Sequence, residues 1–277
     1  MKLDLHTHST ASDGVLAPAA LLAQAIEADV ELFSITDHDS LAAYDAIAGA
    51  PLGRLRLLPG IELTAQWRGQ VVHVLGYGFD AGRGALRAGV EAQRRRRAER
   101  AAALGARLAR LGIADTFEGA RALAGEGSIG RPHFARHLLA VGAVRSVEEA
   151  FEKYLGDRAT AGVGSAWASL DEAVAWIRAD GGQAVLAHPV KYRYTHTRLR
   201  ELLADFVAAG GCGLEVLCGR QPPGALVEMA KLCQRFGLEA SMGSDFHAPE
   251  AWQPAPGVMS RLPHGIPALW ERWAVCA

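Results

Sequence analysis

Metal-binding side chains are concentrated in the first fourteen residues of the chain, MKLDLHTHSTASDG. His6 and His8 are two residues apart, so in an extended strand both imidazoles point to one face while Leu3 and Leu5 point to the other. Imidazole and carboxylate groups, here with Asp13 close by, are ligands that divalent transition metals favour. This stretch therefore predicts a first strand that packs with its apolar face and binds metal at its end.

The same side-chain types recur at or near the ends of five later apolar runs. They are Asp37, His38 and Asp39 after the second run, Glu62 at the end of the third, His73 within the fourth, His188 at the end of the fifth, and Asp245 and His247 after the seventh. In barrels of parallel strands, the loops at the carboxyl ends of the strands carry the chemistry. A single histidine at a strand end is more often a packed or surface residue, but six segments that deliver imidazoles and carboxylates to one end predict a metal site.

The elements that must position these residues alternate between strands and helices. Short β-rich runs alternate with Ala/Leu-rich stretches of helical spacing, which is typical of α/β proteins. The seven predicted strands are residues 2–6, 31–36, 55–63, 71–77, 183–188, 213–217 and 238–243. The predicted helices between them are residues 18–28, 41–48, 170–179, 198–208 and 222–236. This order predicts a barrel.

One long segment breaks the alternation, because it contains three or four helical runs and no convincing strand. We therefore expect residues 1–84 and 165–277 to form a metal-binding barrel and residues 85–164 to form an inserted helical subdomain that binds substrate. Between residues 91 and 110 the insertion has seven Arg and two Glu. A solvated helix face and an RNA contact are both open interpretations of this excess of positive charge.

The composition excludes several classes of protein. With 29 basic and 30 acidic residues and a net charge of -1, the 277-residue chain lacks the net positive charge that attracts long nucleic acid. Its four cysteines form no CxxC pair, which indicates reduced thiols and a cytoplasmic setting. No signal-peptide core or membrane-spanning stretch is evident, and no obligatory protein partner is indicated.

Six motifs resemble, in order, those of a known family. DLHTHSTASDG, ITDHD, GIELTA, HVLGY, AHP and GSDFH are similar to the motifs of the polymerase and histidinol phosphatase (PHP) family of metal-dependent phosphoesterases, relatives of the amidohydrolases. The resemblance implies a distorted seven-stranded β/α barrel that holds up to three divalent metals, with Glu62 bridging two of them. The three implied ligand sets are His6, His8, Glu62 and Asp245; Glu62, His73 and His188; and Asp13, His38 and His247.

Charge and ligand type agree with that assignment. Six neutral imidazoles and three carboxylates contribute a charge of -3, whereas three divalent ions bring +6, so the cavity suits a phosphate dianion. Nitrogen and oxygen ligands without thiolate suit Mn, Fe or Zn and do not choose among them; of the three we favour Mn, with Zn or Fe as alternatives. We expect Asp4, Asp37 and Asp39 to orient the imidazoles or to cap the next helix.

The substrate is indicated by two further motifs. In SIGRPHFARHLL, Pro132 fits the first turn of a helix whose free amides and dipole would face an anion. We expect Arg131, His133 and Lys191 to hold a phosphate there, with Arg136 as either a further contact or a salt-bridged surface residue. GRPH and HPVKY resemble the branch of the PHP family that removes the 3'-phosphate of nucleoside 3',5'-bisphosphates and trims short 5'-phosphorylated RNA from its 5' end.

The resulting expectation is metal-assisted hydrolysis at a ribose 3'-oxygen beside an anchored 5'-phosphate, which yields a 5'-mononucleotide. His188, Asp245 or a metal-bound water would protonate the leaving oxygen. The native metal, the preferred base, the oligomeric state and the choice between bisphosphate nucleotide and short RNA stay open. The rival functions are a histidinol or other small-molecule phosphatase, an amidohydrolase and a non-catalytic metal-binding module.

Overall fold

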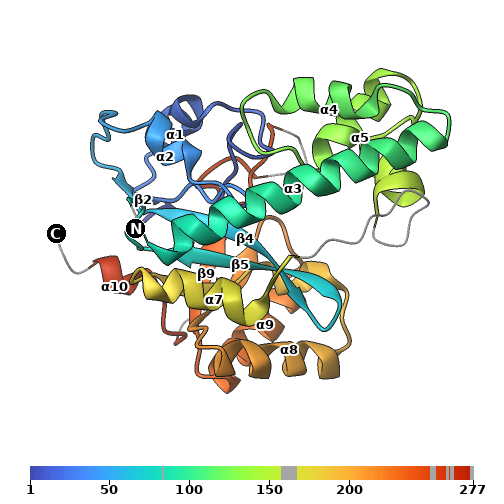
Figure 1. Cartoon of the computed structure of the whole chain (residues 1–277). Helices are drawn as coiled ribbons and strands as arrows, with labels where there is room; N and C mark the ends of the chain where they lie inside the picture. The colour runs from blue at the N-terminus through green and yellow to red at the C-terminus, as the bar shows by residue number, and fades with distance from the viewer. Residues whose placement is uncertain (83, 157–166, 250–253, 260–261, 263–264, 275–277) are drawn as a thin grey trace.

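Two β-sheets form the centre of the molecule (Figure 1). The computed structural model describes residues 1–82, 84–156, 167–249, 254–259, 262 and 265–274. A three-stranded parallel sheet has the order β1-β2-β3, with β1 Leu3–Asp4, β2 Leu32–Phe33 and β3 Arg56–Leu57. A six-stranded mixed sheet has the order β6-β4-β5-β7-β8-β9, with β6 Ala168–Ser169, β4 Gly60–Trp67, β5 Gln70–Tyr77, β7 Gln183–Leu186, β8 Gly213–Cys218 and β9 Glu239–Gly243. The predicted α/β class is confirmed.

The two sheets touch along their edges without forming one continuous ring of strands. The Leu5 amide donates to the Met242 carbonyl at 3.2 Å, which joins the end of β1 to β9. On the other side, His38 and Glu62 form an isolated parallel bridge between the loop after β2 and β4. A closed seven-stranded barrel is therefore not confirmed in the described part of the chain.

Strand β5 runs opposite to the direction that a parallel barrel requires. Its pairings with β4 and with β7 are both antiparallel. Arg68 and Gly69, with φ of 45° and 77°, make a two-residue turn of the kind that joins antiparallel strands. The expectation of parallel strands throughout was therefore wrong at β5, and His73 reaches the site from the first half of its strand.

The predicted third strand is in fact two strands. Residues 55–63 contain β3 and the beginning of β4, separated by Leu58 and Pro59. Glu62 is consequently the third residue of an eight-residue strand rather than a strand end. β6 was not predicted, because two residues give no periodic signal.

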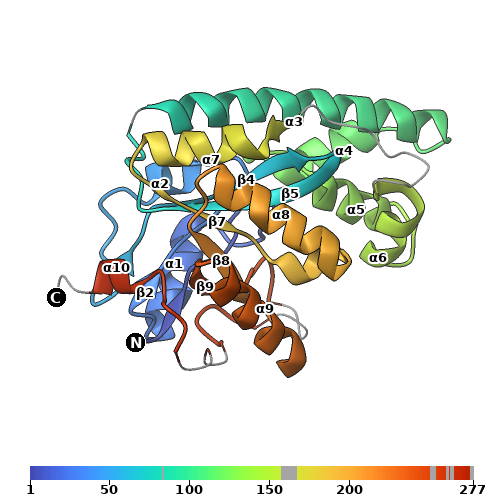
Figure 2. The same ribbon diagram turned by 90° about the horizontal axis from the view of Figure 1, so that it is seen from below.

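The helices outside the insertion lie within about two residues of their predicted ends. They are α1 Pro18–Glu27, α2 Ala42–Ala46, α7 Leu170–Ala179, α8 His196–Ala208 and α9 Pro223–Arg235, with a short 3₁₀ turn at Pro189–Tyr192 and α10 at Glu271–Ala274. α7 begins in a capping box, in which Ser169 Oγ accepts from the Glu172 amide and Glu172 Oε2 accepts from the Ser169 amide. Figure 2 shows α7 and α8 packed near the β4–β5 hairpin.

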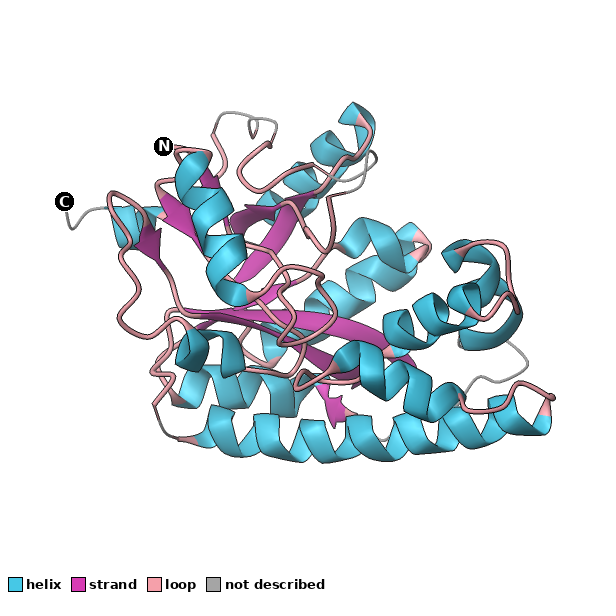
Figure 3. Cartoon of the chain, turned by 90° about the horizontal axis from the view of Figure 1, so that it is seen from above, coloured by secondary structure: helices cyan, strands magenta, loops and turns pink. Residues whose placement is uncertain are grey.

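The inserted segment is helical, as expected. It contains α3 Ala85–Arg110, α4 Thr116–Ala124, α5 Arg131–Ala140, α6 Val147–Ala150 and a π-helical turn at Phe151–Leu155. Figure 1 shows α4 and α5 beside the C-terminal half of α3, and Figure 3 shows the long helix α3 running along one side of the molecule. Leu104, Leu108, Phe134 and Leu138 belong to a separate apolar cluster within the inserted segment, whereas the first half of α3 packs on the main core through Val90. The predicted boundary at 164/165 lies outside the described residues.

The expectations about membrane spans and cysteines can be compared with the described residues only. None of the helices in the described ranges combines the length and the hydropathy needed to cross a bilayer. Cys212, Cys218 and Cys233 are free thiols. The fourth cysteine, Cys276, lies outside the described residues.

Candidate metal centre

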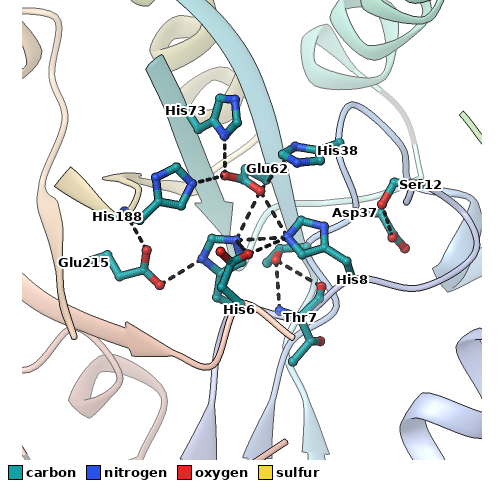
Figure 4. A network of polar contacts seen from close by, with 12 residues as sticks. His6, Thr7, His8, Ser12, Asp37, His38, Glu62, His73, His188 and Glu215 are labelled. Atoms are coloured by element: carbon teal, nitrogen blue, oxygen red, sulfur yellow. Dashed lines mark hydrogen bonds and ion pairs between the residues drawn. The ribbon is translucent and has the colours of Figure 1, made fainter. Parts of the chain in front are cut away.

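Four buried side chains direct their donor atoms toward one point (Figure 4). His6 Nε2 lies 3.1 Å from His8 Nε2, 3.1 Å from Glu62 Oε2 and 3.3 Å from Asp245 Oδ1. His8 Nε2 lies 3.2 Å from both of those carboxylate oxygens. Nitrogen and oxygen ligands about 2.0–2.2 Å from one ion have this mutual spacing. The residues therefore fit a divalent metal.

The orientation of His6 is fixed by an acid on β8 that the sequence analysis did not single out. His6 Nδ1 is 2.9 Å from Glu215 Oε1, and because a carboxylate accepts, Nδ1 carries a proton, which would leave Nε2 as the atom that binds an ion. The second oxygen of Glu215 accepts from the His188 amide at 2.7 Å. Glu215 is buried inside the apolar run GLEVL, and an acid in such a run is the signal that could have identified it.

Glu62 stands at the centre of the imidazoles. Its Oε1 is 2.8 Å from both His73 Nδ1 and His188 Nε2, and its Oε2 is 3.2 Å from His38 Nδ1. Burial alone would raise the pKa of Glu62, but the charges of His38, His6 and His73 hold it well below its usual range. A carboxylate that uses its two oxygens toward two groups of imidazoles fits the expected bridging position.

A third group contains His8, Asp13, His38 and His247. Asp13 Oδ1 lies 3.4 Å from His247 Nε2, and Asp13 Oδ2 lies 3.9 Å from His38 Nε2. Nδ1 of His8 and Nδ1 of His188 have no hydrogen-bond partner although both atoms are buried. Buried nitrogens of this kind are costly unless they are satisfied, as a bound ion would do. All nine residues predicted as ligands thus lie in one continuous cluster.

The backbone around the cluster is constrained. His188, Asp245 and Asp39 have φ of 27°, 53° and 48°, a left-handed region that residues other than glycine adopt at a cost. β9 approaches β1 so closely that a Cβ on Gly243 would lie 2.3 Å from His6 Cβ. The Asp245 amide then donates to the His6 carbonyl at 2.7 Å. These contacts fix Asp245 beside His6.

Two of the acids expected to play a supporting role bind backbone amides and hydroxyls. Asp37 accepts from the Ser9 amide at 2.8 Å and from the Ser12 hydroxyl at 2.6 Å, which orders the loop that carries Asp13. Asp4 accepts from the Ser244 amide at 2.9 Å, next to Asp245. Both carboxylates therefore hold the loops of the cluster.

A cleft of about 120 Å³ adjoins the cluster. Asp13, His38 and His73 line its metal side. The inserted segment and the residue before β6 line the other side, with Arg97, Arg100, Arg131, Pro132, Phe151 and Trp167. Three guanidinium groups beside a metal cluster favour a phosphorylated ligand. Arg97 and Arg100 were not singled out from the sequence, because they are part of the long arginine run of α3.

The predicted substrate residues all have partners within the protein. His133 is buried, its Nδ1 accepts from the Gly130 amide at 3.0 Å, and burial lowers its pKa to about 4, so it is neutral at pH 7. Arg136 donates to the backbone carbonyl of Asp13, and the Lys191 ammonium contacts Asp245. Arg131 lines the cleft and also donates to the Leu155 carbonyl at 3.4 Å, whereas Arg136 and Lys191 contact residues of the metal cluster.

Two curated bacterial enzymes match the chain along nearly its whole length. A 5'-3' exoribonuclease of Haemophilus influenzae is 37% identical over 274 residues, which cover 98% of this chain and 99% of the relative. A 3',5'-nucleoside bisphosphate phosphatase of Chromobacterium violaceum is 40% identical over 271 residues, which cover 97% and 95%. The chain belongs to the PHP family of metal-dependent phosphoesterases.

Solved structures agree with membership of the PHP family. A Chromobacterium violaceum protein described as an amidohydrolase, with bound sulfate and no metal, has a TM-score of 0.93 at 39% identity and covers 99% of this chain and 96% of its own. A Bifidobacterium adolescentis protein assigned to the metal-dependent phosphoesterases has a TM-score of 0.81 at 26% identity, covering 99% and 94%. No protein-family model matches the chain.

Proposed function

We propose that this PHP-family chain removes the 3'-phosphate of nucleoside 3',5'-bisphosphates, giving 5'-mononucleotides, and trims short 5'-phosphorylated RNA from its 5' end. The observation that carries the proposal is the cleft, which places three arginines beside the His/Asp/Glu cluster. A substrate with two phosphates can place one phosphate at the His/Asp/Glu cluster and the other at the arginines. The names of the two relatives support the same pair of reactions.

The cluster is proposed to hold two to three divalent ions, with Mn favoured and Zn or Fe as alternatives. The ligand sets are His6, His8, Glu62 and Asp245; Glu62, His73 and His188; and Asp13, His38 and His247. When bound, the ions supply an activated water and polarise the phosphoryl oxygens. The protein's own contribution is to fix the ligands, as Glu215 does for His6.

Arg131 is proposed to anchor the phosphate that does not react. It is the first residue of α5, after Gly130 and before Pro132, so its guanidinium stands at the end of the helix whose dipole favours an anion. Binding energy at this remote phosphate would align the 3'-ester for attack. His133, if it contacts the anion, does so as a neutral N–H donor, because its pKa is about 4.

Substrate recognition and metal binding are assigned to the two predicted parts of the chain. Residues 85–164 are proposed to carry substrate recognition, and residues 1–84 and 165–277 the metal-binding barrel, in a cytoplasmic protein that needs no partner chain. His188 and Asp245 are the protein's candidates for protonating the leaving 3'-oxygen. The backbone of both residues is fixed by contacts to Glu215 and to His6.

Substrate comparison tests this proposal. Mn-loaded protein is incubated with adenosine 3',5'-bisphosphate, histidinol phosphate and a 5'-phosphorylated dinucleotide, and phosphate or 5'-mononucleotide release is measured. We expect the bisphosphate and the dinucleotide to be cleaved with much higher kcat/KM than histidinol phosphate. A preference for histidinol phosphate, or no cleavage of any phosphoester, would contradict the proposal.

A further inference from the structure

Asp39, the last residue of the TDHD motif, ties the loop that carries His38 to strand β4. The Asp39 amide donates to the Glu62 carbonyl at 2.9 Å, and Asp39 Oδ1 accepts from the Thr64 amide at 2.8 Å. Asp39 adopts a left-handed conformation, which turns the backbone after it away from β4. The next amide of β4, that of Thr64, therefore donates to the Asp39 side chain instead of to a backbone carbonyl. The relative position of His38 and Glu62 therefore depends on this carboxylate.

The inserted helix α3 holds the same carboxylate from the opposite side. Arg97 Nε lies 2.6 Å from Asp39 Oδ2, and Arg97 Nη2 lies 2.7 Å from Thr64 Oγ1. Gln93 Nε2 donates to the Thr64 carbonyl at 2.5 Å and to Asp39 Oδ1 at 3.3 Å. The contacts reach across 58 residues of sequence, from the insertion to the loop of a metal ligand.

The burial of this group makes its partner important. Asp39 is fully buried, and the Arg97 side chain is 12% exposed. A buried carboxylate is costly unless it is paired and hydrogen-bonded. The Arg97 guanidinium is held further by the Trp167 ring, whose centroid is 5.2 Å from Cζ. Arg97 is therefore a fixed cation rather than a mobile surface arginine.

We propose that Arg97, acting through Asp39, is a positioning residue for the metal centre, so that the inserted helix completes the site that binds metal as well as lining the cleft. Without Arg97, the Asp39 carboxylate would leave Thr64 for water or another donor. The His38 loop would then separate from Glu62. The inference rests on the proposed metal centre, but it concerns metal affinity and does not depend on which phosphoester is cleaved.

The test compares Mn binding of the wild type with that of Arg97→Met, Arg97→Lys and Arg94→Met, by calorimetry and by metal content after dialysis. We expect Arg97→Met to bind Mn about 10- to 100-fold more weakly at the site that uses His38. Arg97→Lys should recover part of the affinity, because it keeps a charge for Asp39 but cannot also reach Thr64. Arg94→Met is the matched control, since Arg94 is 51% exposed on the same helix, and it should bind Mn like the wild type.

Two other roles for Arg97 predict different results. If Arg97 only contacts substrate, Arg97→Met should bind Mn normally and show a raised KM for adenosine 3',5'-bisphosphate, which would overturn the proposal. If Arg97 only stabilises the fold, the melting temperature should fall while the Mn affinity of the folded protein stays unchanged, with the same consequence. Should Arg97→Met fail to fold, Arg97→Gln removes the charge that pairs with the buried Asp39 carboxylate but keeps a polar side chain, and unchanged Mn affinity in that variant would overturn the proposal. If Arg97→Met binds Mn more weakly and the wild type cleaves no phosphoester, the proposed function is refuted and this inference stands.

Discussion

Glu62 Oε1 lies 2.8 Å from His73 Nδ1, diagonally across the β4–β5 hairpin. Thr64 is directly opposite His73 in the register, so Glu62 and His73 share one face of the sheet. The same Glu62 carboxylate faces His6 and His38 through its second oxygen. One buried carboxylate thus joins ligands from β4, β5 and the loops after β1 and β2.

Glu62→Gln should reduce metal content and lower kcat by at least about a hundredfold, because the amide keeps the shape of the carboxylate but removes the charge that joins the ligand groups. Metal analysis and steady-state kinetics on adenosine 3',5'-bisphosphate check this. Glu201→Gln, an exposed acid paired with Arg68, is the control and should change neither quantity. Normal metal content and rate in Glu62→Gln would remove Glu62 from the centre.

Glu215→Gln should weaken Mn binding about tenfold or more. The neutral amide still accepts from His6 Nδ1, but it no longer stabilises that proton by charge, and its NH₂ group would face the His188 amide in place of an acceptor. Calorimetry with Mn measures the effect. Wild-type affinity in a folded variant would show that Glu215 is only a packed acid.

Arg131→Ala should lower kcat/KM in a substrate-dependent way. The loss of a charge-assisted contact costs roughly 1.5 to 3 kcal/mol, on the order of tenfold to a hundredfold. Adenosine 3',5'-bisphosphate should show the full loss, whereas adenosine 3'-monophosphate, which has no 5'-phosphate, should hardly change. Equal mutant-to-wild-type ratios for the two substrates would contradict the anchor role and leave the metal site standing.

His133 gives the metal-free protein a defined acid sensitivity. Its folded pKa of about 4 lies below the value of 6.5 for a free histidine, so the unfolded chain takes up the proton first as the pH falls. The stabilisation from neutral His133 is complete above about pH 6.5 and is lost progressively toward pH 4. His133→Gln, which keeps an acceptor for the Gly130 amide, should lose less unfolding free energy between pH 7 and pH 5 in denaturant titrations. Identical pH dependence in both proteins would show that His133 is not held neutral.

Much of the site could be predicted from the sequence, because strand alternation and strand ends determine where side chains point. The pair His6 and His8 and the group Asp13, His38 and His247 follow from this rule, and the structure brings them together. The direction of β5 depends on the two-residue turn at Arg68 and Gly69, which the parallel-barrel expectation overlooked.

The supporting residues could not be predicted in the same way. Glu215 and Arg97 act through contacts to His6 and Asp39 that are far away in the sequence. An arginine within a run of four gives no sign of which one turns inward, because that depends on the packing of α3 against β4. Such side chains become recognisable only when the fold places a buried acid opposite them.

Removal and return of metal test the central claim most directly. Protein stripped with a chelator and checked for metal content is assayed for phosphate release from adenosine 3',5'-bisphosphate, before and after addition of Mn. We expect no activity without metal and recovery of activity with Mn, because the proposed nucleophile is a water that the bound ions activate, and the clustered imidazoles and carboxylates are arranged to bind those ions. Full activity of demonstrably metal-free protein would contradict the account.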